Sequence, residues 1–403
     1  DGPVWLRCVV RIPGEWLGDG PVSLSPGEVR TQRTSANRAP LEVFLNGERL
    51  TAESDGSFRL PASAVIPDDH NLLVLRPMLT SGDGKQQLAL VGTWQSRVGD
   101  DPAGSNIPLP AKFGGGADIV FAPEDPLWVA RPLTPVGAFT PGIEGPAVDR
   151  EGRVLAVNYE RQGTIGRVMP TGAAEVFAAL PPGTVGNGIR IDQLGRISVA
   201  DYVGHNVLRI DPESRSVEVF AHEPRMNQPN DLAIAADGTL FASDPNWSAG
   251  TGQLWRIDRD GTTTLLAEGL GTTNGLDLSP DERTLYVNES VQRNVWAFTV
   301  TDDRTLRDKR LVRKFDDHGF DGMRVDVDGN LYITRYGKGT VIKMTPAGEI
   351  LQEIDVLGAR PSNLCFGVPD GRTVYVTEVE GARLVRFRVD RPGREWQLQA
   401  AAP

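Results

Sequence analysis

The sequence is poor in cysteine and histidine, the residues that carry disulfide frameworks and many metal sites. Its 403 residues include two cysteines, Cys8 and Cys365, and four histidines. Two cysteines so far apart, in different predicted domains, favour unpaired thiols. The first residue is Asp1 rather than methionine, so we expect that an N-terminal segment has been removed. A periplasmic or secreted location fits this expectation, with the cytoplasm as the alternative.

Three further absences exclude classes of partner. No stretch of about 18 apolar residues is present, so no membrane-spanning helix is expected. The net charge of −11 is not offset by any basic run, so neither nucleic acid nor an anionic membrane is an expected partner. Nucleophile-elbow, P-loop and dinucleotide fingerprints are also missing, and Gly114-Gly-Gly116 reads as a linker. A small-molecule substrate is the partner that remains.

Glycine and proline, in contrast, are abundant, with 45 and 30 residues, which suits many short strands joined by turns. Residues 1–110 show alternating apolar runs separated by the hairpin signals Asn46-Gly47 and Asp55-Gly56. They predict a small N-terminal β-sandwich followed by a connector that ends near residue 110. Sugar binding and a plain packing or targeting role are its two alternative functions.

Residues 111–403 repeat a strand–turn–strand unit. Six polar residues open these units at spacings of 43, 43, 44, 47 and 42 residues, and a glycine follows eight residues later in all but one, where Glu282 stands. A period near 43 residues with this content is typical of a β-propeller blade. The sequence therefore predicts an all-β protein, a six-bladed β-propeller preceded by the small sandwich, with units that open at Glu144, Asn187, Asn230, Asn274, Asp321 and Asn363.

The last unit lacks an obvious fourth strand. Residues 134–139, just before the first unit, would close the ring if they paired with the last blade. The alternative is a strand at 396–399 in the tail.

The six opening residues are predicted to meet at one end of the central channel, because the innermost strands of all blades start at the same face. They comprise two carboxylates and four amides. Buried together without a counter-charge, these groups would be costly, so a cation is expected among them. Oxygen ligands alone select a hard cation, and Ca²⁺ fits best, with Zn²⁺, Mg²⁺ and Mn²⁺ as the other candidates.

At these positions the chain resembles the SMP-30/gluconolactonase/LRE-like family of six-bladed propellers, over residues 130–393. The motifs that carry the resemblance are Glu144-Gly-Pro, Pro229-Asn-Asp-Leu, Asn274-Gly-Leu-Asp-Leu-Ser-Pro-Asp, Asp321-Gly-Met-Arg-Val-Asp and Leu364-Cys-Phe-Gly367. The resemblance implies a calcium-dependent lactonase in which Glu144, Asn230, Asn274 and Asp321 bind the ion. Sugar-lactone members carry an arginine two residues before the asparagine of the second motif, where this chain has Gln228, so the preference for an aldonolactone is in doubt.

The catalytic hypothesis is hydrolysis of a small lactone by a water that a base activates. Asp321 is the first candidate for base or nucleophile. Asp201 and Asp244, which directly follow second strands, are the next. Residues expected to contact substrate are Asn187, Gln228, Asn363, Tyr202, His205 and Trp247. The alternatives are a non-catalytic binding propeller with a structural ion and another metal-assisted reaction, such as phosphotriester hydrolysis or a lyase step.

Overall fold

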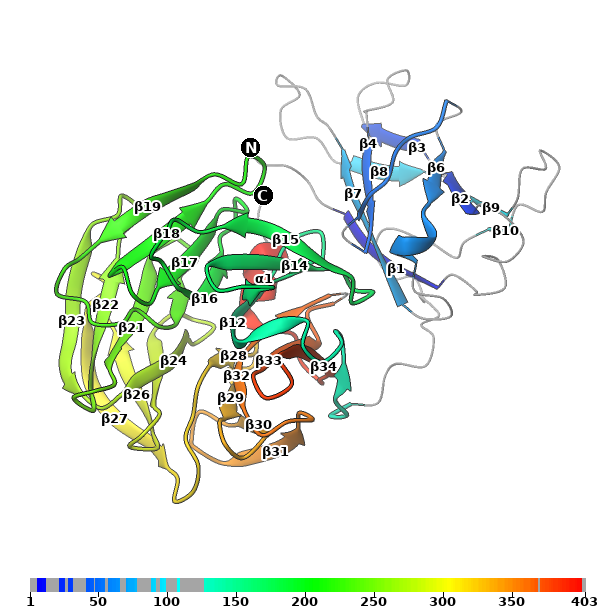
Figure 1. The fold of residues 1–403 in the computed structure, drawn as a ribbon. Coiled ribbons are helices and arrows are strands. Elements are labelled where there is room, and N and C mark those ends of the chain that lie inside the picture. Colours follow the sequence, from blue (N-terminus) through cyan, green and yellow to red (C-terminus); the bar gives the residue numbers. More distant parts are fainter. Residues whose placement is uncertain are drawn as a thin grey trace.

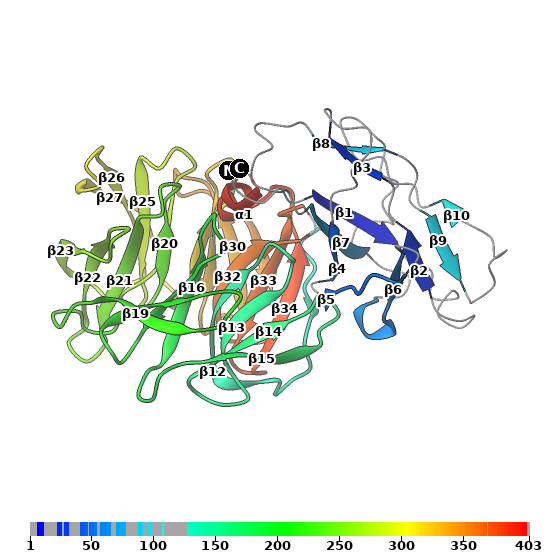
Figure 2. The ribbon, with the colours of Figure 1, turned by 90° about the horizontal axis from the view of Figure 1, so that it is seen from above.

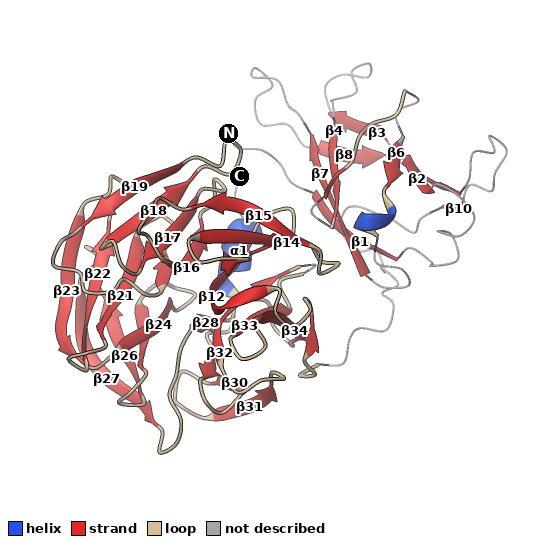
Figure 3. Ribbon diagram, in the orientation of Figure 1, coloured by secondary structure: helices blue, strands red, loops and turns tan. Residues whose placement is uncertain are grey.

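The computed structural model describes residues 127–400 except 369 and, before them, the stretches 6–11, 22–25, 28–31, 41–46, 48–54, 57–65, 70–77, 88–91, 95–98 and 107–108. From residue 131 onward, strands form six four-stranded antiparallel sheets. The sheets are arranged like blades around a common axis, with their first strands innermost (Figures 1 and 3). The predicted six-bladed propeller is confirmed.

Each of the first five blades is built from four consecutive strands, and the sixth combines three late strands with an early one. Blade 1 contains β12 (Phe139–Val148), β13 (Val154–Tyr159), β14 (Thr164–Val168) and β15 (Ala174–Ala179). Blade 2 contains β16 (Gly186–Ile191), β17 (Ile197–Asp201), β18 (Asn206–Ile210) and β19 (Val217–His222). Blade 3 contains β20 (Leu232–Ile234), β21 (Leu240–Asn246), β22 (Thr251–Ile257) and β23 (Thr263–Leu270). Blades 4 to 6 contain β24 (Thr273–Leu278), β25 (Thr284–Glu289), β26 (Asn294–Val300), β27 (Leu306–Lys314); β28 (Met323–Val325), β29 (Leu331–Arg335), β30 (Thr340–Met344), β31 (Ile350–Asp355); β32 (Pro361–Gly367), β33 (Thr373–Glu378), β34 (Arg383–Arg388), β11 (Arg131–Pro132).

Burial changes from the axis to the rim of each blade. The innermost strand β24 is buried at every residue, whereas the outermost strand β27 is exposed along much of its length. The core lies between neighbouring blades: Phe241 of blade 3 belongs to the same apolar cluster as Leu276 and Leu285 of blade 4. Burial of this apolar surface between sheets is the main force that holds the blades in a ring.

The glycine repeat marks the turn between the first and second strands. Gly152 and Gly238, for example, have φ values of 88° and 89°, in the left-handed region where glycine is favoured. Glu282 occupies the same turn in blade 4 with φ of 58°. Its carboxylate accepts a hydrogen bond from Arg394 at 2.7 Å and pairs with Arg304 at 2.8 Å. The one departure from glycine therefore provides an anchor for the end of the chain.

The ring is closed from the N-terminal side. Strand β11 pairs antiparallel with β34, and the backbone N–H of Phe139 donates to Ala382 O at 2.9 Å. The closing strand thus comes from the segment before the first unit, as one alternative predicted, with its paired residues at 131–132. The rival strand at 396–399 is wrong, because those residues belong to the helix α1 (Arg394–Ala400). This helix contacts β28 and β32 and lies over the centre of the ring (Figures 1 and 2).

The described N-terminal stretches are also strands. They form two four-stranded sheets, β1–β7–β4–β5 and β10–β9–β2–β6, and the pair β3–β8. Their bounds are β1 (Leu6–Arg11), β2 (Val22–Ser25), β3 (Glu28–Thr31), β4 (Leu41–Leu45), β5 (Glu48–Arg49), β6 (Phe58–Leu60), β7 (His70–Pro77), β8 (Leu88–Val91), β9 (Gln95–Val98) and β10 (Ile107–Pro108), with a short 3-10 helix, Ala62–Ala64. The β-sandwich stays a prediction, and its boundary near residue 110 lies outside the described residues. In the described chain, no helix has the length and apolarity needed to cross a bilayer.

Candidate active site

Close packing between neighbouring inner strands brings the opening residues together. The backbone N–H of Gly275 donates to Asp321 O, in the next blade, at 2.9 Å. A Cβ atom at Gly275 would stand 2.5 Å from that oxygen, and one at Gly322 would stand 2.0 Å from Oδ1 of Asn363. Any larger residue would separate the blades. A glycine directly after the opening residue is therefore part of the site, and the sequence shows one in four of the six units.

A cavity of about 700 Å³ opens at this end of the channel. Four of the six opening residues line it: Glu144, Asn187, Asn230 and Asp321. The other two, Asn274 and Asn363, are buried but do not line it. Four of the six opening residues, which were predicted to meet, therefore do line one pocket.

The side-chain oxygens of the opening residues have few partners. Four of them are buried and accept no hydrogen bond from any described residue: Glu144 Oε1 and the Oδ1 atoms of Asn187, Asn230 and Asn274. Asn274 uses its amide nitrogen instead, as a donor to Ser290 Oγ at 3.0 Å. Buried acceptors in native proteins are almost always satisfied, so a cluster of four without partners indicates a missing cation or ligand.

The carboxyl groups at the floor are perturbed in the same sense. Burial, together with repulsion from Asp231, raises the pKa of Glu144 to about 8. Burial and then repulsion from Glu144 raise the pKa of Asp321 well above its usual value. The mutual repulsion shows that the two carboxyls are neighbours. A bound cation would reverse both shifts by favouring the ionised forms.

The donor set fits a hard divalent cation. In the described part of the chain, no group of three His, Cys, Asp or Glu side chains is placed to hold a metal ion, so a site here depends on amide oxygens as well as on two carboxylates. Carboxylates and amide carbonyls are the ligands that Ca²⁺ accepts most readily, in flexible geometry and together with water. The residues present therefore fit such an ion, with Glu144, Asn230, Asn274 and Asp321 as its holders.

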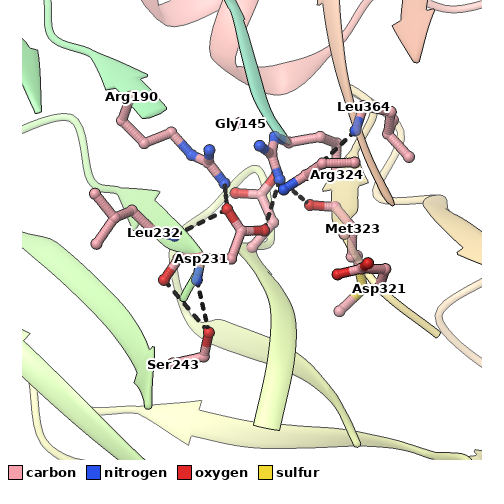
Figure 4. Close-up of polar contacts among 12 residues, drawn as sticks. Gly145, Arg190, Asp231, Leu232, Ser243, Asp321, Met323, Arg324 and Leu364 are labelled. Carbon is pink, nitrogen blue, oxygen red and sulfur yellow. Dashed lines mark hydrogen bonds and ion pairs between the residues drawn. The ribbon is translucent and has the colours of Figure 1, made fainter. Parts of the chain in front are cut away.

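A second layer of charged side chains lies next to this floor and does contain protein cations. The Asp231 carboxylate forms ion pairs with Arg190, whose Nη2 lies at 3.1 Å, and with Arg324, whose Nη1 lies at 3.0 Å. All three side chains are at most 1% exposed. In Figure 4 the two guanidinium groups approach Asp231 from two sides, while Asp321 lies apart from them.

The helix α1 completes this second layer. Glu395 pairs with Arg190 at 2.6 Å, and Arg394 lies 3.5 Å from Asp277 and donates to Ile234 O at 3.0 Å. Burial, with repulsion from Glu395, raises the pKa of Asp277 to about 6. We call these side chains the ionic layer: Arg190, Asp231, Asp277, Arg324, Arg394 and Glu395. Each carboxylate of the layer lies beside at least one guanidinium, so the layer supplies its own counter-cations.

The two further catalytic candidates are held in structural roles. Asp201 accepts hydrogen bonds from Val185 N at 3.1 Å, Gly204 N at 3.1 Å and Asn206 Nδ2 at 2.8 Å. Asp244 accepts from Asn227 N at 2.8 Å and from Trp255 Nε1 at 3.1 Å, among others. Neither residue lines the cavity. The expectation that they reach the pocket is wrong, because backbone N–H groups already occupy their oxygens.

The same position of the repeat is acidic in two more blades. The Glu289 carboxylate accepts a hydrogen bond from Gly271 N at 2.8 Å. The Glu378 carboxylate accepts hydrogen bonds from Glu380 N at 2.8 Å and from Gly381 N at 2.7 Å. We call this set the strand-end acids: Asp201, Asp244, Glu289 and Glu378. Each fixes a loop at the end of a second strand, and this repetition is a signal of structure that the sequence does display.

The predicted substrate residues divide into two groups. Tyr202, Trp247 and Asn187 line the cavity, whereas Gln228, His205 and Asn363 do not. His205 Nδ1 lies 2.5 Å from Met226 O, and Gln228 Oε1 accepts Trp247 N at 3.3 Å. Gln228 therefore stands behind the pocket and supports a residue of its wall.

Several further wall residues lie outside the set of predicted substrate contacts, and they come from loops rather than from the repeat position. Burial and then the carboxylate of Asp321 raise the pKa of Tyr336, and the same two causes act on Tyr202, so both phenols lie near the floor. Nε1 of Trp247 is buried, and it lies close enough to the Tyr202 phenol to counter part of the rise in the pKa of that phenol by a hydrogen bond. The further lining residues include Asn158, Gln162, Ser290, Arg293, His318 and Phe320.

A six-bladed propeller with an oxygen-lined pocket at its axis defines the class of protein. The family model described as the SMP-30/Gluconolactonase/LRE-like region matches residues 143–380. The chain belongs to this family. Its fold and its opening motifs therefore agree with the resemblance that the sequence suggested.

Individual relatives support the same placement. A gluconolactonase from Zymomonas mobilis is 28% identical over 323 residues, which is 71% of this chain and 88% of the relative. A pentonolactonase from Haloferax volcanii is 31% identical over 156 residues, 38% of this chain and 53% of that protein. Among solved structures, a calcium-binding protein named regucalcin from Agrobacterium tumefaciens matches with a TM-score of 0.57 and 19% identity, covering 66% of this chain and 95% of that one. At this identity the structural match shows the fold alone.

Proposed function

We propose that the protein is a divalent-cation-dependent lactonase that hydrolyses a small, sugar-derived lactone in the axial cavity, with Ca²⁺ as the ion. The observation that carries this proposal is the set of four unpartnered oxygens on opening residues, three of which line the cavity together with Asp321. The gluconolactonase and pentonolactonase among the relatives support the reaction class. A donor set made only of oxygen atoms supports the choice of Ca²⁺.

Glu144, Asn230, Asn274 and Asp321 hold the ion, and Asn187 adds an acceptor at the same floor. When bound, a divalent cation supplies Lewis-acid polarisation of a carbonyl oxygen. Asp321 accepts the proton of the attacking water at a carboxylate oxygen. Carboxylates are established general bases for proton transfers of this kind.

The wall positions the substrate. Trp247 offers the Nε1 donor, and Tyr202 and Tyr336 offer phenol groups near Asp321. Aromatic faces combined with hydrogen-bonding edges suit a polyhydroxylated ring. The buried floor also limits water access, which strengthens every charge interaction at the reacting carbonyl.

The direct test is hydrolysis of a lactone panel that includes glucono-1,5-lactone, before and after EDTA and with Ca²⁺, Zn²⁺, Mg²⁺ or Mn²⁺ restored. Activity should vanish on chelation and return with Ca²⁺. Glu144→Gln should lower kcat/KM by about 10²–10³-fold, because it removes a ligand charge and one of the acceptors. Ion binding measured by calorimetry should weaken in parallel.

Glu378→Gln is the matched control. It also replaces a buried glutamate by its amide, but this glutamate is satisfied by backbone N–H groups away from the cavity. It should change stability and leave the calcium response intact. A protein that binds Ca²⁺ tightly yet opens no lactone would contradict the proposal and favour a binding propeller with a structural ion.

A further inference from the structure

The cavity has two kinds of charged lining, separated by depth. Its acidic lining residues, among those the structure describes, are Glu144 and Asp321 at the floor. The basic ones are Arg293, between β25 and β26, and His318, between β27 and β28. With a cation at the floor neutralising the two carboxylates, the remaining charge on the pocket lining is positive.

Arg293 is fixed in place but has spare hydrogen-bond donors. Its backbone N–H donates to Glu289 O at 2.8 Å, and its carbonyl accepts Phe315 N at 2.9 Å. Nη1 donates to Asp316 O at 2.6 Å, whereas Nε is buried and has no partner in the described chain. A guanidinium has five N–H donors, so most of its binding capacity is unused. In the same described residues, no carboxylate forms an ion pair with it.

One acidic side chain beside this wall, Asp317, is already engaged. Asp317, next to the residue that holds Arg293, pairs with Arg335 at 2.6 Å and with Lys338 at 3.6 Å. It also lies 3.2 Å from Nδ1 of His318. The hydrogen bond from Arg335 and that from His318 hold the pKa of Asp317 well below its usual range. Asp317 is therefore a satisfied anion, and it does not form an ion pair with Arg293.

The backbone at both basic positions is unfavourable for a residue with a side chain. Arg293 has φ of 61° and His318 has φ of 39°, in the left-handed region that glycine and asparagine adopt more readily. The residue before the third strand is left-handed in other blades too, with φ of 56° at His205 and 48° at Ala382, so at Arg293 this conformation belongs to the turn of the blade.

The cavity also has more room than a plain hexonolactone needs. A lactone of about a dozen non-hydrogen atoms, at no more than the roughly 30 Å³ that a water molecule takes in the liquid, fills about half of a volume near 700 Å³. The remaining space lies within reach of the wall residues that line the same cavity.

We propose that the substrate is a lactone bearing an oxyanion group at the end remote from its ring carbonyl, and that Arg293 is the specificity residue that binds this group, with His318 beside it. The inference rests on the proposed lactonase function and adds the charge of the substrate. Planar guanidinium donors bind carboxylate, phosphate or sulfonate oxygens in pairs, with a charge-assisted hydrogen bond at each contact.

The test compares glucono-1,5-lactone with its 6-carboxylate and 6-phosphate counterparts of the same ring size, at low and high salt. The wild-type protein should prefer an anionic lactone by about tenfold or more in kcat/KM, mainly through KM, and the preference should shrink with salt. Arg293→Gln should reduce the ratio of kcat/KM for anionic over neutral lactone by about tenfold. Arg293→Lys, which keeps the charge and loses the fork, should give an intermediate ratio.

Arg307→Gln is the matched control, because Arg307 is exposed on β27 and does not line the cavity. It should leave the ratio unchanged. A wild-type preference for the neutral lactone, or a ratio that Arg293→Gln does not alter, would overturn the inference.

Calorimetric binding of the ring-opened products in Ca²⁺ buffer separates this inference from the proposed function. The 6-phosphate and 6-carboxylate forms of gluconate should bind more tightly than gluconate, and Arg293→Gln should abolish the difference. If that pattern appears while no lactone is hydrolysed, the anion subsite stands and the proposed function fails. If neutral lactone is hydrolysed and neither readout depends on Arg293, the proposed function stands and the anion subsite fails.

Discussion

The cavity floor and the ionic layer are two sets of buried charged groups in one channel, and the fold treats them in opposite ways. In the ionic layer, Asp231 is met by two guanidinium groups at 3.1 and 3.0 Å. At the floor, Glu144 and Asp321 have raised pKa values and stand among acceptors without partners. Where the chain supplies its own cations, the charges are structural. Where the chain supplies no cation, the carboxylates can bind an external ion that takes part in catalysis.

The sharpest way to break this comparison is to remove the base at the floor. Asp321→Asn should reduce kcat for lactone hydrolysis by about 10³-fold, because it removes both a proton acceptor and a ligand charge. The ion-free protein should not lose stability, since one of two neighbouring buried carboxyls is gone. Initial rates together with thermal melts in EDTA measure both effects. An ion-free variant that melts far below the wild type would show that Asp321 is structural.

The opposite change removes a cation from the ionic layer. Arg324→Met leaves Asp231 and Glu395 without one of their partners, which should cost about 3–5 kcal/mol of the free energy of unfolding. Urea unfolding with Ca²⁺ absent measures this. Arg391→Gln serves as the control, since the Arg391–Asp328 pair is about half exposed and such pairs contribute roughly 0–1 kcal/mol. Equal effects of the two variants would argue against a structural ionic layer.

The two regions should also differ in their dependence on pH and on the ion. A carboxyl whose pKa is raised in the folded state binds protons there that the unfolded chain releases. The ion-free protein should therefore lose stability as the pH rises from about 4.5 to about 8, the interval between the ordinary and the raised pKa of Glu144. The slope is at most about 1.4 kcal/mol per pH unit for each such carboxyl.

Saturating Ca²⁺ should flatten this slope. The affinity for Ca²⁺ should also increase with rising pH, because protons and the ion compete for the same oxygens. Bound ion at about 100 times its Kd adds roughly 2.7 kcal/mol of stability. Melts across this pH range, with EDTA or Ca²⁺, provide the measurement. Glu144→Gln should reduce the slope in EDTA; a wild-type slope of the opposite sign would refute the assignment of the raised pKa.

The smallest catalytic effect is expected at the strand-end acids. Asp201→Ala removes the acceptor of several hydrogen bonds and should cost about 1–3 kcal/mol of stability. Its kcat should stay within about threefold of wild type, because Asp201 does not line the cavity. A large loss of kcat in a variant that remains folded would restore Asp201 as a catalytic candidate.

Much of the architecture could be predicted from the sequence because a propeller repeats its instructions. The period of the opening residues and the glycines after them fixed the number of blades, and the identity of Glu144, Asn230, Asn274 and Asp321 suggested an ion site before any geometry was known. These features are local and recur, so their positions in space follow from the symmetry of the ring.

The errors arose where a polar residue has a hidden partner. Asp201 and Asp244 have the spacing of site residues, but the sequence does not show the backbone N–H groups that occupy them. The helix α1 was not predicted, and a strand at 396–399 was kept as the alternative for ring closure, because a segment of seven residues shows neither period clearly. Its long-range partners, Asp277 and Glu282, lie more than a hundred residues away in sequence. Long-range ion pairs of this kind leave no periodic signal.

Closure of the ring by β11 has a consequence for the order of events during synthesis. The hydroxyl of Thr134 accepts a hydrogen bond from Leu384 N, 250 residues later in the chain. The segment 131–139 must therefore wait, without its partner strand, until nearly the whole propeller has left the ribosome. Contacts of such high sequence separation form late and slowly, and an unpaired strand edge exposed meanwhile invites aggregation. Yield during expression should thus depend on protection of this nascent edge, and a chaperone that covers it should help more than any change at the cavity.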